Sequence, residues 1–209
     1  TIVGLGSAPI FAGVLAFVVF GERPGRRWLF ATLLSIAGCS LLLLAGRDAP
    51  VAIRFTGLLL AVGAGAAYAG YALTVKQLLA KKSSLAVMAV VGCLGALMIL
   101  PLILTRDFSW LAHSRGVAVA LYLGFLTYAL PMFLFAYGLS LTPVATAVTM
   151  TLMEPLTAGL LGIFIVGEHF TLTAWGGLLM MLSGLFVLTV STRRELSINN
   201  DVDHDGYCL

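Results

Sequence analysis

Seven long apolar stretches, separated by short polar segments, dominate the pattern of this sequence. Each comes close to the roughly 20 residues that a helix needs to cross a bilayer. They cover Ile2–Phe20, Trp28–Ala45, Gly57–Leu79, Leu85–Leu104, Gly116–Leu139, Pro143–Val166 and Leu172–Val190. Because lipid offers no partner for backbone N–H and C=O groups, each stretch is predicted to be a helix. The predicted fold class is therefore all-α, a polytopic transmembrane helix bundle with seven spans.

Composition agrees with a lipid environment and excludes several other classes. Hydrophobic residues make up 60% of the chain and charged residues only 10%, and the mean hydropathy is +1.06. Soluble proteins carry about 25% charged residues. The formal net charge of +3 is not gathered in one patch, so nucleic-acid binding is not expected. Three scattered cysteines form no disulfide or metal pattern, and we expect no metal and no cofactor.

The basic residues predict an orientation in the membrane. If the loop at 22–27 faces the cytoplasm, eight of the 12 Lys and Arg residues lie on that side and four on the other. The cytoplasmic set is Arg23, Arg26, Arg27, Lys76, Lys81, Lys82, Arg193 and Arg194, and the opposite set is Arg47, Arg54, Arg106 and Arg115. Positive charge collects on the cytoplasmic side of membrane proteins. We therefore expect a multi-pass protein of the plasma (inner) membrane with its C-terminus in the cytoplasm.

An internal repeat begins on the first predicted span and returns 146 positions later on the sixth. The paired residues are Pro9 with Pro155, Gly13 with Gly159, Gly21 with Gly167, Glu22 with Glu168, and Gly38 with Gly184. Five spans separate the two copies, and an odd number makes them face opposite sides of the membrane. The repeating element is thus five helices, and the intact parent is predicted to have ten spans. Residues 1–46 would be the last two helices of the first repeat, and 55–192 the complete second repeat.

Inverted repeats are typical of secondary transporters, which alternate between two conformations by exchanging the roles of their halves. A duplication that only built a stable bundle is the alternative. On this interpretation the chain is a fragment that lacks the first three helices of its parent.

The residues around the second copy resemble a known family. Met153, Glu154 and Pro155, followed by Gly159, Gly167, Glu168, Trp175, Gly176 and Gly184, resemble the second EamA domain of the drug/metabolite transporter superfamily. Pro9, Gly13, Gly21, Glu22 and Gly38 resemble the end of its first domain. The resemblance covers residues 1–192. It implies a ten-helix carrier that works by alternating access and often exports amino acids or related small metabolites.

Glu154 is the sharpest single candidate for a transport residue. It lies near the middle of the sixth span, where an acidic side chain costs about 2.5–3.5 kcal/mol on insertion scales. Pro155 cannot donate an N–H, so the preceding turn should be disrupted and its carbonyls freed beside the carboxylate. The first copy has Ala8 at the matching position. We predict that Glu154 contacts substrate or a coupling proton; a protonated, structural Glu is the alternative.

Further candidates lie at depth in other spans. Tyr68, Tyr71 and Tyr128 need partners for their hydroxyls, and together with Thr151 they could line a substrate path or simply bond neighbouring helices. Glu22 and Glu168 follow glycines at span ends and are expected to be anchors. Pro131 should kink the fifth span. Small residues at every fourth position of the third span predict a close helix contact, and they are Gly57, Ala61, Gly65 and Ala69.

The tail, residues 193–209, is expected to be cytoplasmic and disordered. It contains Asp201, Asp203, Asp205 and Gly206 at the spacing of the first half of an EF-hand loop. The position for the bidentate Glu falls beyond Leu209, so a disordered acidic tail is the preferred interpretation over calcium binding.

The predicted function is a membrane carrier that moves small metabolites, such as amino acids, amines or drug-like compounds, by export. The expected partners are a small-molecule substrate and the lipid bilayer, and a homodimer is allowed for. The alternatives are a non-transporting membrane scaffold, a non-functional truncated product and, less favoured, an integral-membrane enzyme. An enzyme would need a nucleophile with a base, paired carboxylates or a histidine cluster, and His113, His169 and His204 all lie outside the spans.

Overall fold

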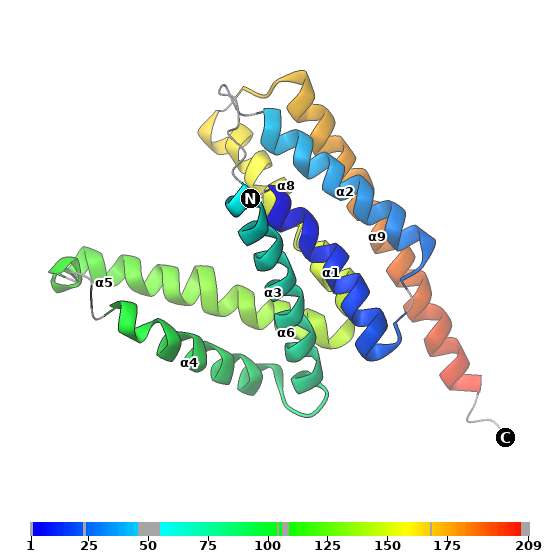
Figure 1. The fold of residues 1–209 in the computed structure, drawn as a ribbon, viewed down its shortest axis with the longest axis horizontal. Helices are drawn as coiled ribbons and strands as arrows, with labels where there is room; N and C mark the ends of the chain where they lie inside the picture. Colours follow the sequence, from blue (N-terminus) through cyan, green and yellow to red (C-terminus); the bar gives the residue numbers. More distant parts are fainter. Residues whose placement is uncertain are drawn as a thin grey trace. The chain divides into compact units, whose positions relative to one another are not determined.

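The computed structural model describes residues 2–22, 24–45, 55–103, 105, 109–167 and 169–205. Every secondary-structure element that these residues form is a helix, and none of them lies in a strand. In chain order (Figure 1) the elements are α1 (Ile2–Phe20), α2 (Arg26–Ala45), α3 (Phe55–Leu79), α4 (Ser84–Ile103), the 3-10 helix η1 (Ser109–Ala112), α5 (Ser114–Leu121), the π-helix η2 (Tyr122–Ala129), α6 (Leu130–Leu141), α7 (Val144–Met150), α8 (Met153–Leu161), the π-helix η3 (Gly162–Val166) and α9 (Leu172–Asp205).

Within the described residues, seven helical segments are long and apolar enough to cross a membrane. They coincide with the seven predicted spans, and their ends differ from the predicted ends by two residues at most. The all-α, multi-pass fold class is therefore confirmed. The fifth span is built from α5, η2 and α6, and the sixth from α7, α8 and η3.

The fifth span is π-helical in the segment before Pro131. The π-helix η2 ends at Ala129, and the N–H of Leu130 bonds the carbonyl of Phe125, five residues back. Pro131 has no N–H, so the helix cannot continue its regular ladder at this position. The Thr127 hydroxyl donates to the carbonyl of Leu123 at 2.6 Å. The segment before Pro131 is thus π-helical, and the kink predicted at Pro131 stays a prediction.

The described chain divides into two compact units. The first consists of residues 1–73 and 143–209, and the second of residues 74–142. In the first unit, α2 and α9 lie side by side along most of their length (Figure 1). α7 packs along α1, and the hydroxyls of Thr32 on α2 and Thr149 on α7 are 3.3 Å apart and buried. Several of the largest fully buried side chains of the described residues lie in this unit, among them Leu152, Leu178 and Met181.

The two copies of the repeat adopt the same turn. Gly21 and Gly167 have φ angles of +67° and +75° and are the glycines with positive φ within the described chain. After Gly21, the N–H of Glu22 bonds the carbonyl of Ala16 at 3.3 Å, which closes the end of α1. Only glycine enters this left-handed region without a steric cost, so the matching glycines carry a matching backbone.

The late glycines of the repeat form the contact between α2 and α9. A Cβ at Gly38 would lie 2.6 Å from the Gly177 carbonyl oxygen and 2.6 Å from the Met181 nitrogen. A Cβ at Gly184 would lie 2.8 Å from the Ala31 carbonyl oxygen and 2.9 Å from the Ser35 nitrogen. At the offset of 146, Ala31 and Ser35 correspond to Gly177 and Met181, so the two glycines make equivalent contacts. A two-fold axis between antiparallel α2 and α9 produces this packing.

Small residues also bring α1 and α3 together. A Cβ at Gly65 would lie 3.0 Å from the Gly4 carbonyl oxygen and 3.1 Å from the Ala8 nitrogen, and Ala69 is fully buried. Gly57 is exposed with open space beside it. The predicted close contact is thus confirmed at Gly65 and Ala69 but was wrong at Gly57, which lies at the start of the helix.

The second unit is held at one end by a lysine. The Lys76 ammonium donates to the carbonyl oxygens of Leu139 at 2.7 Å, Ser140 at 3.3 Å and Thr142 at 3.0 Å. These carbonyls lie at the end of α6, where they have no partner within the helix. A cation is also favoured there by the helix dipole. Lys76 therefore fastens the end of α3 to the end of α6.

The tail differs from its prediction. α9 continues through Asp205, although disorder was expected from residue 193. No Gly or Pro occurs between Leu185 and Asp205, so nothing in the sequence interrupts the helix after the span ends. Residues 201–205 are helical and do not form a calcium-binding loop, and Gly206 lies outside the described residues.

Candidate functional site

The sixth span is interrupted four residues before its proline. α7 ends at Met150 and α8 begins at Met153, with Thr151 and Leu152 in a turn between them. Across the interruption the N–H groups bond three residues back: Thr151 to Val148 at 3.3 Å, Leu152 to Thr149 at 3.1 Å, and Glu154 to Thr151 at 3.0 Å. Pro155 supplies no N–H to the carbonyl of Thr151, so the Glu154 N–H bonds it instead.

The carbonyls at this break are occupied. The Thr151 hydroxyl donates to the Val148 carbonyl at 2.7 Å, and the Thr149 hydroxyl donates to the Ala145 carbonyl at 2.8 Å. The prediction of a disrupted turn is confirmed. The prediction that this disruption leaves carbonyls free for a cation was wrong for Val148 and Thr151, because local N–H and hydroxyl donors reach them. The group at the break that remains for a ligand is the Glu154 carboxylate.

Four of the predicted site residues come together in the first unit. Tyr68 makes a side-chain hydrogen bond with Thr151 and interacts electrostatically with Tyr71 and Glu154. The rings of Tyr68 and Tyr71 have their centroids 6.0 Å apart, with their planes tilted by 31°. α3 therefore places two phenol hydroxyls near the break in the sixth span, beside its carboxylate.

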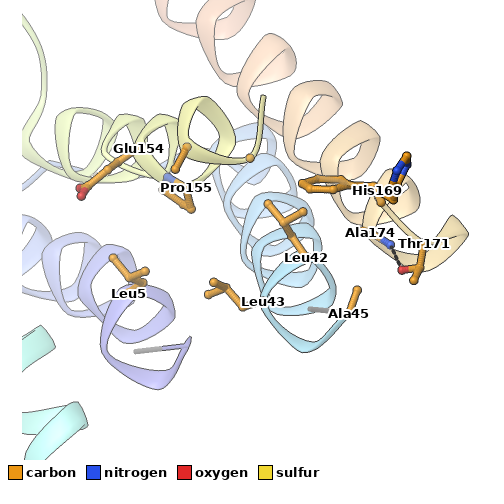
Figure 2. A pocket seen from close by; sticks show the side chains of 12 residues that line it. Leu5, Leu42, Leu43, Ala45, Glu154, Pro155, His169, Thr171 and Ala174 are labelled. Carbon is orange, nitrogen blue, oxygen red and sulfur yellow. Dashed lines mark hydrogen bonds between the residues drawn. The ribbon is translucent and has the colours of Figure 1, made fainter. Parts of the chain in front are cut away.

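Glu154 and Pro155 also line a cavity of about 650 Å³ within the first unit. Its walls come from the start of α1, the end of α2, α8 and the segment that leads into α9 (Figure 2). The lining residues are Leu5, Leu42, Leu43, Ala45, Glu154, Pro155, Ala158, Gly159, His169, Phe170, Thr171 and Ala174. Most of this wall is aliphatic or aromatic, and the Glu154 side chain is exposed at its edge.

Sequence reasoning missed His169 as a cavity residue. It was predicted to lie outside the spans, which is correct, since it follows Gly167 in the segment before α9. That segment turns back over α8, and Phe170 approaches Gly159 so closely that a Cβ there would lie 3.5 Å from its ring. Phe170 is itself held edge-on by Trp175, with centroids 6.2 Å apart. The repeat offered one signal, because residue 169 directly follows the repeated Gly-Glu pair.

The remaining predicted residues lie elsewhere or cannot be placed. Tyr128 is on η2 in the second unit, with 56% of its side chain exposed. Glu22 follows Gly21 just after the end of α1, which is the position predicted for it. Pro9 lies inside α1, which continues through it without a break. Glu168 lies outside the described residues, so its anchoring role stays a prediction.

The first copy of the repeat has a smaller pocket that shares three of its positions with the Glu154 cavity. It measures about 290 Å³ and is lined almost wholly by apolar groups of α1 and α2. Gly13, Pro24 and Trp28 occupy the positions that Gly159, Phe170 and Ala174 occupy in the second copy. The Trp28 indole covers Gly13, so that a Cβ at Gly13 would lie 2.5 Å from its ring. A large side chain thus fills in the first copy the space that Ala174 leaves open in the second.

Comparison with known proteins agrees with this architecture. Residues 55–190 match the EamA-like transporter family. A Bacillus subtilis (strain 168) protein, "Uncharacterized transporter YwfM", is 40% identical over 195 residues, which are 93% of this chain and 65% of that protein. The "Threonine/homoserine exporter RhtA" of Escherichia coli (strain K12) is 31% identical over 201 residues, 94% of this chain and 67% of that protein. The chain therefore spans about two thirds of the length of these relatives.

A solved crystal structure has the same fold. It superimposes with a TM-score of 0.70 at 20% sequence identity and covers 92% of this chain and 68% of the other. At this identity the likeness concerns the fold alone.

Proposed function

Because this chain belongs to the EamA-like transporter family, we propose that it forms part of a membrane carrier for small metabolites that bear an amine. The substrate class comprises amino acids, amines and drug-like cations. The observation that carries the proposal is the Glu154 carboxylate, which lies at a break in a spanning helix and lines a largely apolar cavity. Interrupted helices near the membrane midplane are where carriers of this kind hold their substrates.

The carboxylate gives the cavity its chemistry. In a region of low polarity an ionised Glu154 attracts an ammonium group strongly, whereas a protonated Glu154 does not. A proton and a substrate cation therefore compete for one site, which couples the movement of one to the release of the other. Tyr68 lies near enough to interact with the carboxylate, and Tyr71 lies beside Tyr68.

Export by alternating access is the proposed direction and mode. In the orientation predicted from the basic residues, the end of α2 and the segment before α9 lie on the non-cytoplasmic side, where an exporter releases its substrate. The repeat, with its shared turns and its α2–α9 contact, supports a parent of ten spans in two inverted halves. The name of one relative, a threonine/homoserine exporter, supports both the direction and an amino acid as substrate.

Transport assays with Glu154 variants test the proposal. The protein is reconstituted in proteoliposomes, and counterflow of radiolabelled threonine, homoserine and a set of primary amines is measured. We expect Glu154→Gln to lower the rate by at least about tenfold, the loss for one charge-assisted contact. Glu154→Asp should retain part of the activity. Glu195→Gln, which neutralises a carboxylate beyond the last span, is the matched control and should leave transport unchanged.

Two results would count against this function. Transport by Glu154→Gln at the wild-type rate would remove the carboxylate from the mechanism. Failure of the wild-type protein to transport any member of the set, under conditions in which it remains folded, would favour a non-transporting membrane protein.

A further inference from the structure

The pocket of the first copy is a groove between α1 and α2 that opens outward. It measures about 290 Å³, and among the described residues no side chain lines both it and the Glu154 cavity. Val14, Phe17 and Leu33 form part of its wall and are each between 51% and 56% exposed. Because α1 and α2 are spanning segments, this wall faces the surroundings of the protein within the membrane.

The groove matches one leaflet of a bilayer in length. It begins at Pro24, in the turn between the two helices, and reaches Ile10, ten residues before the end of α1 at Phe20. At 1.5 Å per residue this distance is about 15 Å of helix. The hydrocarbon core of a bilayer is about 30 Å thick, so one leaflet contributes about 15 Å. A lipid acyl chain therefore fits the groove in both length and polarity.

Positive charge lies at the shallow end of the groove. α2 begins at Arg26, and both Arg26 and Arg27 are exposed, between the groove residues Pro24 and Trp28. The first N–H groups of a helix have no partner within the helix, and the helix dipole adds partial positive charge there. Residues 22–27 contain three arginines and one glutamate. This end of the groove therefore favours an anionic group at the level of the lipid headgroups.

The helix packed beside α2 brings further basic positions to the same end. Gly184 on α9 contacts Ala31 on α2, and the two helices are antiparallel. The start of α2 therefore lies beside the end of the last span at Val190. Arg193 and Arg194 occupy the next turn of α9, which continues as a helix. Basic residues clustered directly beyond a spanning helix are typical of sites that bind anionic lipids.

We propose that this groove binds one anionic phospholipid, with an acyl chain between α1 and α2 and its phosphate at Arg26 and Arg27. The planar guanidinium groups donate paired hydrogen bonds to phosphate oxygens. A zwitterionic lipid offers the same acyl chain, but the cation of its headgroup weakens the attraction to the two arginines. The site is independent of Glu154 and of the transported substrate.

Quenching of Trp28 fluorescence by brominated lipid tests the proposal. Trp110→Phe and Trp175→Phe leave Trp28 as the single tryptophan of the full chain. The protein is reconstituted in phosphatidylcholine vesicles that contain increasing fractions of brominated phosphatidylglycerol or, in a parallel series, brominated phosphatidylcholine. The two quenching curves give the binding constant of the anionic lipid relative to the zwitterionic one. We expect phosphatidylglycerol to be preferred by at least about fivefold, the effect of one arginine near a membrane surface.

The preference should depend on the two arginines. Arg26→Gln combined with Arg27→Gln should abolish it and leave quenching by the zwitterionic lipid unchanged. Salt at about 1 M should also reduce it, because screening weakens attraction between exposed charges. Arg115→Gln, which removes an exposed arginine from the first turn of α5, is the matched control and should keep the preference. Leu94→Trp, on the exposed side of α4 in a chain without the other tryptophans, should report no preference.

Three results would overturn the proposal. Equal quenching of Trp28 by the two lipids would show ordinary contact with the surrounding bilayer. Protection of Trp28 from both lipids would show that another helix or a second copy of the chain covers the groove. A preference that survives the double arginine substitution would place the anionic lipid at another site.

Discussion

The two copies of the repeat share their glycines and differ in the residues around them. Gly21 and Gly167 make the same left-handed turn, and Gly38 and Gly184 make equivalent contacts between α2 and α9. The prolines, however, have different effects, since α1 runs through Pro9 while the sixth span breaks before Pro155. The common features build the scaffold, and the departures from symmetry mark where the second copy gains a cavity.

Two substitutions and two threonine hydroxyls distinguish the copies. Ala8 is 6% exposed against α3, whereas its counterpart Glu154 is exposed to the cavity. Trp28 covers Gly13, whereas its counterpart Ala174 leaves space at the cavity wall. Proline alone does not decide whether the helix breaks. Before Pro155 the hydroxyls of Thr149 and Thr151 bond the carbonyls of Ala145 and Val148 in α7, which stabilises an interrupted helix.

The largest effect on stability is expected when a carboxylate is placed in the first copy of the repeat, at position 8. The nitrogen of Ala8 lies 3.1 Å from a Cβ built at Gly65, so Ala8→Glu forces an ionisable group into a packed helix contact. We expect a loss of about 3 kcal/mol of stability, the cost of a carboxylate at this depth. Glu154→Ala should leave stability nearly unchanged. Thermal midpoints from fluorescence-detected size-exclusion chromatography measure both, and equal midpoints would contradict the assignment of the two environments.

The symmetric glycine contact should respond equally in both copies. Gly38→Ala and Gly184→Ala each place a Cβ within 3 Å of backbone atoms, which should lower stability by about 2 kcal/mol. Gly176→Ala on α9 is the matched control, because no atom outside its own helix lies within 4 Å of the new Cβ. Thermal unfolding in detergent measures all three. Unequal losses at positions 38 and 184 would show that the α2–α9 contact is not symmetric.

Placing a tryptophan at position 174, the counterpart of Trp28, should fill the cavity of the second copy. Ala174→Trp introduces an indole at the wall of the cavity, as Trp28 does over Gly13. Ligand binding should weaken by about tenfold, or 1.4 kcal/mol. Calorimetric titration with butylamine measures this effect. Leu179→Trp, on the exposed face of α9, is the control and should bind normally. Normal binding by Ala174→Trp would place the ligand outside this cavity.

The smallest effect is expected at the repeated turns. Gly21→Ala and Gly167→Ala each force a side chain into the left-handed region, at a cost of about 1 kcal/mol. Gly21→Asn and Gly167→Asn should lose less, because asparagine tolerates this conformation. Differential scanning fluorimetry of the four variants measures the ranking. An asparagine variant no more stable than its alanine counterpart would show that another feature of the turn is limiting.

Much of the fold can be predicted from short windows of sequence. The apolar length of each segment determines that it spans a bilayer, because lipid permits only helices there. The repeated glycines predict turns and close contacts, since they alone tolerate a positive φ or the approach of another backbone. Glu154 could also be chosen from the sequence as a candidate site residue, because a carboxylate inside an apolar span raises the free energy of membrane insertion wherever that span packs. These properties are local.

Only the tertiary structure decided which of these residues meet and what they enclose. Glu154 and His169 share a cavity with Leu5 and Leu42, residues more than 100 positions away in the chain. Pro9 and Pro155 have the same chemistry and different outcomes, because the helices packed around them and the hydroxyls before them differ. Hydropathy and spacing describe one helix at a time. The shape and polarity of a site depend on how several helices pack, and in this protein that packing leaves one copy of the repeat filled by Trp28 and the other open beside Glu154.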